Sequence, residues 1–184
     1  IKYFTALLHF FLDLKLTPGG KLLLSPLLLK QKTPADFQHQ SGKVRKEGFE
    51  MEKSKVYFTK NITPEAMIQM YEALGLRLPG KVAVKVHSGE MGNQNFIRPE
   101  FMQPIIHYVK GTVVECNTAY EGKRNTTKEH WETMASHGWT RFFQVDIMDE
   151  EGEMELPVSG GKQLSVNYVG DHFRNYDSVL VLSH

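Results

Sequence analysis

The chain has 184 residues, with 22 Lys and Arg against 21 Asp and Glu, which gives a net charge of +1. A charge so close to zero leaves no electrostatic footprint for nucleic acid or an anionic membrane, because both need clustered basic side chains. Cys116 is the one cysteine, so an internal disulfide is excluded, as is an Fe–S cluster held by this chain alone. The composition favours a globular protein of a reducing compartment, and we expect it to be cytoplasmic.

Residues 1–50 differ in character from the rest. Their apolar runs, such as Leu22–Leu29, are too short to span a bilayer, and no clear leader or cleavage site accompanies them. Lys46-Glu47-Gly48 is the peptide that a translated purine-rich ribosome-binding site would give, and it stands just before Met51. We therefore predict that residues 1–50 are a non-native or disordered upstream extension, with a degenerate signal or a helical arm as alternatives, and that residues 51–184 form the domain.

From Met51 onward the pattern alternates between strands and helices. Runs of β-branched residues predict the strands, and apolar side chains at helical spacing predict the helices. Thr63 and Thr126 are expected N-caps, the latter in a capping box with Glu129. In chain order we predict a strand at 55–59, a helix from 63 to 75, a strand at 81–87, a helix at 99–110, a strand at 112–118, a helix at 126–137, a strand at 141–146, a β-hairpin within 155–169 and a strand at 178–184.

This order predicts an α/β fold, with a mostly parallel sheet, helices packed on it and a β-hairpin insertion around Gly160-Gly161. Pro104 lacks a backbone N–H, so the helix at 99–110 is expected to start late or to kink. The chain stops on a strand, and we therefore interpret it as truncated at its carboxyl end.

The predicted site lies where the strand at 81–87 ends in His87 and opens into a polar loop. Ligands of open α/β sheets bind at the carboxyl ends of the strands. His87 and Glu90 are candidate metal ligands, or a base near a bound anion, and Cys116 and His184 end two further strands. The candidate cofactor-binding residues are Ser88, Gly89, Asn93, Asn95, Arg98 and Asn117.

Each of these assignments has a structural alternative. His87 and Glu90 are open to being solvated loop residues, Cys116 to being an inert core thiol, and Arg98 to tying its own loop down. Tyr120 and Arg124 either close over a ligand or pack within their loop. Four aromatic residues of the following segment are expected to be surface or packing residues, namely His130, Trp131, His137 and Trp139. The acidic run 149–153 is expected to be a solvated turn, and residues 171–174 either an ordinary surface turn or a second loop over the site.

The common nucleotide, hydrolase and zinc signatures are absent from the sequence. Three segments nevertheless carry a family resemblance: KVAVKVHSGEMGNQNFIRPEF, VVECNTAY with the Arg124-Asn125-Thr126 that follows it, and the terminal DSVLVLSH. Together they resemble the uncharacterised family known as domain of unknown function 362, over about residues 55–184.

The resemblance implies an α/β domain that works beside an iron–sulfur carrier. Family members typically continue past the last strand, and many carry a ferredoxin-like module with Cys clusters for two [4Fe–4S] centres, which this sequence lacks. The resemblance makes His87, Glu90, Cys116 and His184 plausible site residues. We therefore expect the metal- or cofactor-binding part of a redox protein, with a divalent metal or iron as the bound ion. The alternative is a non-catalytic module that holds a metal or docks a ferredoxin, and the reaction itself is not predicted.

Overall fold

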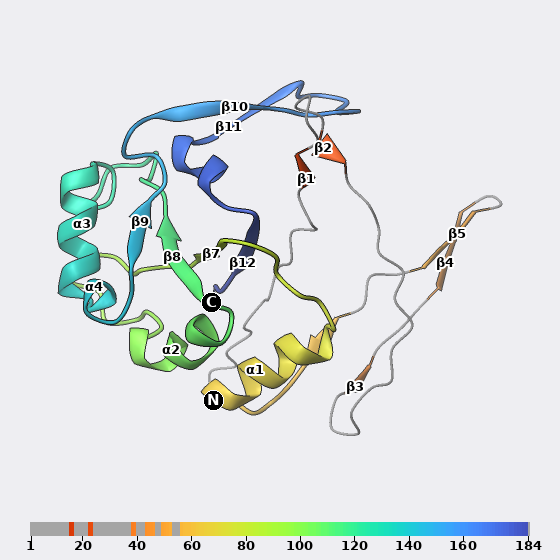
Figure 1. Cartoon of the computed structure of the whole chain (residues 1–184), viewed down its shortest axis with the longest axis horizontal. Coiled ribbons are helices and arrows are strands. Elements are labelled where there is room, and N and C mark those ends of the chain that lie inside the picture. Colours follow the sequence, from red (N-terminus) through yellow and green to blue (C-terminus); the bar gives the residue numbers. More distant parts are fainter. Residues whose placement is uncertain are drawn as a thin grey trace. The chain divides into compact units, whose positions relative to one another are not determined.

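The computed structural model describes residues 56–183 in full and, upstream of them, the backbone of short strands (Figure 1). These strands are β1 (Lys15–Leu16), β2 (Leu22–Leu23), β3 (Gln38–His39), β4 (Lys43–Lys46) and β5 (Phe49–Glu52). β1 pairs with β2 and β4 with β5, both antiparallel. Most of residues 1–50 lie outside the described residues, so the prediction of a non-native extension stays a prediction. The chain divides into two compact units, 28–77 and 1–27 with 78–184.

The unit at 28–77 contains β6 (Tyr57–Phe58) and α1 (Pro64–Ala73). The Thr63 side chain caps α1 as expected, accepting the Ala66 N–H at 3.1 Å. The strand predicted at 55–59 is present as the two-residue β6, and it pairs antiparallel with β3 instead of joining the parallel sheet. A strand joined to its own upstream segment in this way adds nothing to the parallel sheet.

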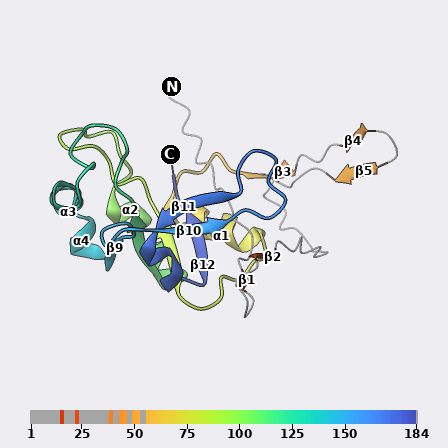
Figure 2. The ribbon, with the colours of Figure 1, turned by 90° about the horizontal axis from the view of Figure 1, so that it is seen from above.

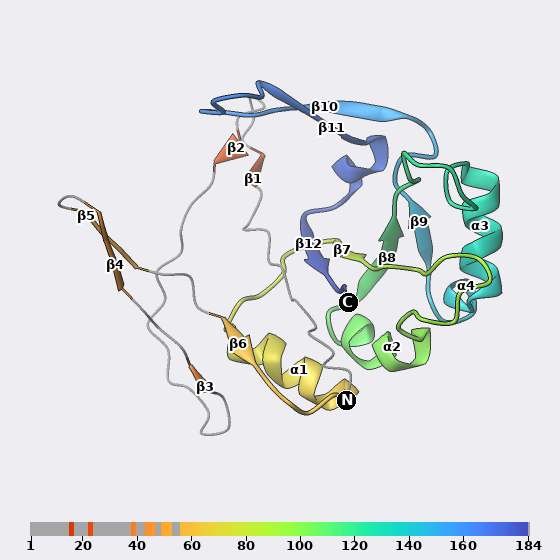
Figure 3. The ribbon, with the colours of Figure 1, turned by 180° about the vertical axis from the view of Figure 1, so that it is seen from behind.

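The other unit contains a parallel sheet of β7 (Val82–Lys85), β8 (Gly111–Glu115), β9 (Val145–Ile147) and β12 (Ser178–Val181). The strand order is β12-β7-β8-β9, and each neighbouring pair is parallel (Figure 3). The two central strands are buried on both faces, which explains their nearly continuous apolar sequence. The predicted α/β fold is confirmed.

The helices of this unit are α2 (Pro99–Tyr108), α3 (Thr127–Ser136) and the short α4 (Trp139–Phe142), which lie together in Figure 2. Thr126 caps α3 by accepting the Glu129 N–H at 3.4 Å, and its hydroxyl donates to the Glu129 side chain at 3.2 Å. α2 begins at Pro99 and runs through Pro104, so the expected late start does not occur.

The strand predicted at 141–146 was placed too early. Gly138, with φ of 86°, ends α3 and lets the chain turn directly into α4. Trp139 is fully buried there, and its indole N–H donates to the carbonyl of Ser88 at 3.1 Å. The aromatic run that resembles a strand is therefore held in a helical turn by a tertiary contact, and β9 begins at Val145.

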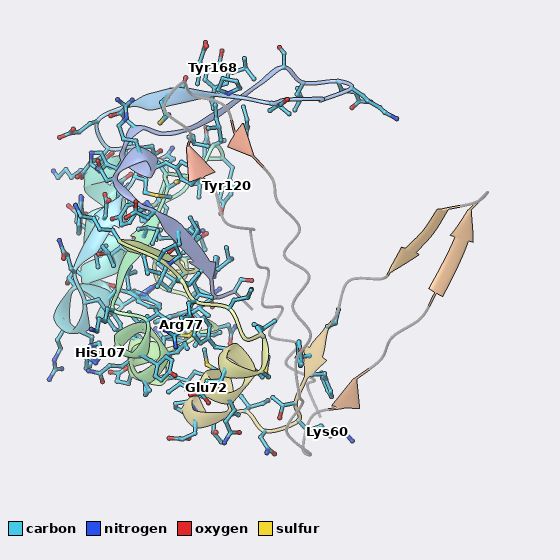
Figure 4. All side chains as sticks on the ribbon, turned by 45° about the vertical axis from the view of Figure 1, so that its right-hand side comes forward. Lys60, Glu72, Arg77, His107, Tyr120 and Tyr168 are labelled. Carbon is cyan, nitrogen blue, oxygen red and sulfur yellow. The ribbon has the colours of Figure 1, made fainter. Side chains whose placement is uncertain are left out.

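The hairpin is confirmed as β10 (Glu153–Pro157) paired antiparallel with β11 (Val166–Gly170). It carries Tyr168, labelled in Figure 4, which is exposed. A short 3₁₀ helix, η1 (Asp171–Asn175), connects β11 to β12. No helix within the described residues is both long and apolar enough to cross a bilayer.

Register divides the sheet into two faces, because residues paired across parallel strands share a face and neighbours along a strand alternate. Val114 pairs with Asp146, whereas Glu115 pairs with Ile147. The face that carries Val114 and Asp146 holds a small core of Ala83, Val114 and Met148. Four partly buried residues pack against this core, namely Cys116, Phe173, Tyr176 and Val179. Glu115 and Asp146 therefore belong to opposite faces.

Truncation of the edge strand tests the sheet core. Leu180 in β12 is 0% exposed, so Leu180→Ala should lower the free energy of unfolding by about 2–5 kcal/mol. The matched control is Leu164→Ala, since Leu164 is 64% exposed and should change stability by less than about 0.5 kcal/mol. Urea titration followed by circular dichroism measures both. Equal losses in the two variants would contradict the described packing of β12.

Candidate functional site

A buried carboxylate organises the carboxyl ends of β7 and β8. Glu115 is 1% exposed, and its Oε2 lies 2.5 Å from the Lys85 ammonium. Its Oε1 accepts the backbone N–H of Ser88 at 2.8 Å and lies 3.5 Å from Nη1 of Arg124. Two cations and a backbone donor thus satisfy one anion. A carboxylate buried this deeply needs such partners, because an unpaired buried charge is costly.

Arg124 ties the loop after β8 to the loop after β7. This side chain is 4% exposed, and both its Nε, at 3.1 Å, and its Nη2 donate to Oε1 of Glu90. The Tyr120 hydroxyl donates to the same oxygen at 2.9 Å. Tyr120 and Arg124, proposed from the sequence as either a closing loop or loop packing, are thus engaged with Glu90. We call the residues Lys85, His87, Ser88, Glu90, Glu115 and Arg124 the carboxyl-edge site.

The charges around Glu90 keep it ionised. The hydrogen bond from Arg124 lowers the pKa of the Glu90 carboxyl, against the opposing effect of burial, and the Tyr120 bond lowers it further. The charge of His87 also contributes to this lowering, so His87 lies within electrostatic range of Glu90. The hydrogen bonds described for Glu90 all go to Oε1.

A second set of polar contacts surrounds Asn117, which follows β8 at the same edge of the sheet. The Asn117 side-chain oxygen accepts from Nδ1 of His130 at 3.2 Å, and the Asn117 amide donates to Thr127 Oγ1 at 2.9 Å. The Asn117 N–H donates to the Asp149 carboxylate at 2.9 and 3.1 Å. Asn117, predicted to bind a cofactor, is thus committed through its side chain and its N–H to contacts that join β8 to α3 and to the turn after β9.

His130 is a fully buried histidine, which confirms the packing assignment and excludes the surface one. Burial lowers its pKa, so the ring is neutral, and because Nδ1 donates to Asn117, Nε2 carries the lone pair. Neither His130 Nε2 nor Ser88 Oγ has a hydrogen-bond partner within the described part of the chain. The spacing of His130 to Thr133 and Met134 on the buried face of α3 is the sequence signal that marks it as internal.

The turn at Ser88-Gly89 is anchored from two sides. The Ser88 carbonyl accepts from Trp139 and also from Nδ1 of His137 at 2.9 Å. The His137 ring stacks on Phe96 with centroids 4.1 Å apart. Gly89 has φ of 91°, and a Cβ there would come within 2.8 Å of Phe96. Only glycine fits this close approach, so Gly89 shapes the loop.

The remaining predicted cofactor residues hold the loop together. Arg98 donates to the carbonyl of Gln94 at 3.2 Å and to its side chain at 3.0 Å, and lies 4.2 Å above the Phe96 ring. The Asn95 N–H donates to Asn93 Oδ1 at 2.8 Å. For Arg98 these contacts match the alternative of an arginine that ties its own loop down. A cofactor-binding role for these residues stays a prediction.

Cys116 is half-buried, and its side chain packs on the apolar core of the sheet. It packs against the core of Ala83, Val114 and Met148. Burial, followed by the charge of Asp149, raises the pKa of its thiol to about 11. The thiol is therefore protonated at neutral pH, which matches the alternative of a core cysteine. Its assignment as a metal ligand stays a prediction.

The topology required by the predicted metal site is present, because β12, β7 and β8 are adjacent and parallel. The Leu182 N–H donates to the Lys85 carbonyl at 2.8 Å, which continues the pairing past β12. His184 lies outside the described residues. The ligand set of His87, Glu90, Cys116 and His184 is therefore neither confirmed nor excluded.

One group that sequence reasoning missed brings together Asp146, Glu150 and His172, which we call the Asp146 cluster. Their possible ligand atoms all lie within 4.8 Å of one another, and within residues 56–183 no such group includes His87 or Cys116. Nδ1 of His172 lies 2.7 Å from Asp146 Oδ1, and Nε2 lies 3.3 Å from Glu151 Oε2. The bond to Asp146 raises the pKa of His172.

The sequence offered only weak signals for this cluster. The solvated turns expected at 149–153 and 171–174 contain two of its members, and the second of these segments is η1 rather than an open turn. The hairpin stands between Asp146 and His172, so no short motif spacing connects them. Recognising the cluster needed the fold of the hairpin.

The family model described as Domain of unknown function (DUF362) matches residues 82–184. This range begins with β7 and includes the whole parallel sheet, the carboxyl-edge site and the Asp146 cluster. No curated protein and no solved structure matches the chain.

Loss of the charge at Glu115 should destabilise the domain. Glu115→Gln keeps the shape but leaves Lys85 and Arg124 without their shared anion, which we expect to cost about 3 kcal/mol of unfolding free energy. The control is Glu121→Gln at an exposed position of the neighbouring loop, where a change below about 0.5 kcal/mol is expected. Urea denaturation measures the unfolding free energy of both variants. An unaltered midpoint in Glu115→Gln would disprove the role given to this carboxylate.

His130 should make stability fall in mild acid. Its pKa in the folded protein is below the ordinary 6.5, so the unfolded chain binds the proton more readily. The unfolding free energy should then decrease from pH 7 to pH 5, by up to about 1.4 kcal/mol per pH unit from this residue. His130→Gln should show a shallower slope whatever its stability at pH 7. Identical slopes for the two proteins would argue against a buried neutral His130.

Proposed function

We propose, from the premise that this chain belongs to the DUF362 family, that its domain binds a metal ion or a small cofactor at the carboxyl-edge site and works beside an iron–sulfur protein. The family is uncharacterised, so membership supplies no reaction. The binding role is argued from the residues of the site, and the iron–sulfur association from the family resemblance of the sequence.

The observation that carries the binding role is the arrangement of Glu90. Arg124 and Tyr120 both donate to Oε1 of Glu90 and lower the pKa of this carboxyl, so the carboxylate is ionised and held in place. His87 lies near enough to influence this carboxyl. A positioned carboxylate within electrostatic range of an imidazole suits a first-row divalent ion, and hydrogen bonds that fix a ligand carboxylate are typical of such sites.

The iron–sulfur association requires a partner that supplies the cluster. Cys116 is the one thiol of the chain, and it is protonated within the core at neutral pH. In this proposal a ferredoxin-like module supplies the electrons, and this domain holds the metal or cofactor at which they are used, as part of an oxidoreductase.

The second candidate is a non-catalytic module that holds a metal or docks a ferredoxin. It is favoured by the charge pairing of the edge, since the cations Lys85 and Arg124 are both engaged by carboxylates. Cations that are paired with carboxylates in this way stabilise the conformation of the two loops. Such pairing is what a binding or docking module needs, and it requires no catalytic turnover. The two candidates share the metal site and differ in electron transfer.

Metal binding should depend on His87 and Glu90. The full chain is stripped of metal and titrated anaerobically with Fe²⁺ and separately with Zn²⁺. As His87→Ala or Glu90→Gln it should lose one equivalent of bound ion, or bind that equivalent at least about 10-fold more weakly. Elemental analysis after desalting gives the stoichiometry. The control is His107→Ala on α2, an exposed histidine labelled in Figure 4. Unchanged affinity and unchanged stoichiometry in both site variants would refute the proposed site.

Electron transfer distinguishes the two candidates. The chain is loaded with Fe²⁺, oxidised to Fe³⁺ with ferricyanide and desalted, then mixed anaerobically with a reduced two-cluster ferredoxin while the cluster absorbance is followed. Reoxidation of the clusters that disappears in His87→Ala supports the redox role, because each Fe³⁺ held at the site accepts one electron from a cluster and becomes Fe²⁺. Binding of ferredoxin without reoxidation supports the docking module instead.

A further inference from the structure

The three possible metal ligands of the Asp146 cluster come from separate parts of the fold. Asp146 lies in β9, Glu150 in the turn that follows, and His172 in η1 beyond the hairpin. Asp146 and His172 are both largely buried, with 16% and 14% of their side chains exposed, whereas Glu150 is exposed. Two members of the cluster are therefore shielded from solvent, and the third is open to it.

Backbone contacts fix the two segments against each other. The His172 N–H donates to the Met148 carbonyl at 3.0 Å, and the Glu150 N–H donates to the Ile147 carbonyl at 3.0 Å. A Cβ at Gly170 would come within 2.5 Å of the Met148 carbonyl group. The absence of a side chain at Gly170 is thus what lets η1 approach the end of β9. Backbone hydrogen bonds, and not side-chain conformations alone, therefore fix where Glu150 and His172 stand.

Each carboxylate is oriented by a neutral donor from outside the cluster. The Tyr176 hydroxyl donates to Oδ2 of Asp146 at 2.6 Å, and the Trp131 indole N–H donates to Oε2 of Glu150 at 2.9 Å. The other oxygen of Asp146, Oδ1, is the one that contacts Nδ1 of His172, and an ion would replace the proton between these two atoms. Bonds of this kind, which hold one oxygen and present the other, are the outer contacts that metal-ligating carboxylates have in proteins.

The local charge is negative. Asp146 and Glu150 belong to the cluster, and Glu151 contacts Nε2 of His172 from the solvent side. Arg174, which is on η1 with His172, is paired with Asp171. The carboxylates therefore outnumber the histidine that faces them, and a divalent cation would offset the excess.

We propose that Asp146, Glu150 and His172 form a binding site for a first-row divalent transition metal. The ligand atoms are Oδ1 of Asp146, Oε1 of Glu150 and Nδ1 of His172, with solvent completing the coordination. Nδ1 gives up its proton to solvent when the ion binds, and Nε2–H keeps its bond to Glu151, which fixes the ring. An imidazole with two carboxylates suits zinc, manganese or iron, whereas calcium and magnesium prefer oxygen ligands alone.

None of these three residues belongs to the carboxyl-edge site. Register places Asp146 on the sheet face of Val114 and Lys85, opposite to the face of Glu115. The two sites share no ligand, so variants of one leave the other in place. The inference therefore stands or falls independently of the proposed function.

The test uses the full chain, Zn²⁺ in isothermal titration, and Co²⁺ as a visible-absorption probe. His87→Ala, which removes a ligand of the other site, is the background and should still bind one equivalent of Zn²⁺ and show Co²⁺ ligand-field bands. Adding Glu150→Gln or His172→Gln to it should weaken Zn²⁺ at least about 10-fold and abolish the bands. Because Glu150 is exposed, Glu150→Gln leaves the core intact.

The matched control adds His107→Gln, an exposed histidine of α2, to the same background and should bind both ions unchanged. Circular dichroism confirms that each variant is folded. The proposal is overturned if the His87→Ala background binds no Zn²⁺, or if the Glu150→Gln and His172→Gln additions bind both ions as the background does.

Discussion

The structure depends on one buried anion, the carboxylate of Glu115 at the end of the central strand β8. Its partners come from three places: Lys85 at the end of β7, the Ser88 N–H in the loop after it, and Arg124 in the loop after β8. Each would be left with an unmet charge or donor if the loops moved apart, and in the interior that is expensive. One side chain thereby sets where two loops leave the sheet.

Local patterns identified most of the fold, because strands and helices here agree with their own sequence. Val82–Lys85 and Gly111–Glu115 are buried β-branched runs, and Thr63 caps α1 as its spacing predicts. The failures came from long-range contacts. Trp139 is held in α4 by its bond to Ser88, and β6 pairs with an upstream strand, neither of which leaves a trace in local periodicity.

The sequence indicated which strand ends gather polar side chains, but not which of these side chains contact one another. Residues at the carboxyl ends of β7 and β8 could be predicted because parallel strands deliver their ends to one edge. Which of these side chains are committed to each other could not, since Arg124 reaches Glu90 across 34 residues. The Asp146 cluster was missed altogether, because its members converge only once the hairpin has folded and Gly170 has let η1 approach Met148.

The contact between Arg124 and Glu90 also couples the two loops electrostatically. A cation that shared the Glu90 carboxylate would weaken its attraction for the guanidinium, and Arg124 would then rely more on Glu115. Arg124 stands two positions before Thr126, the residue that caps α3. Occupancy at the first loop would in this way be transmitted to the start of a helix, by redistribution of charge and without any movement of the sheet.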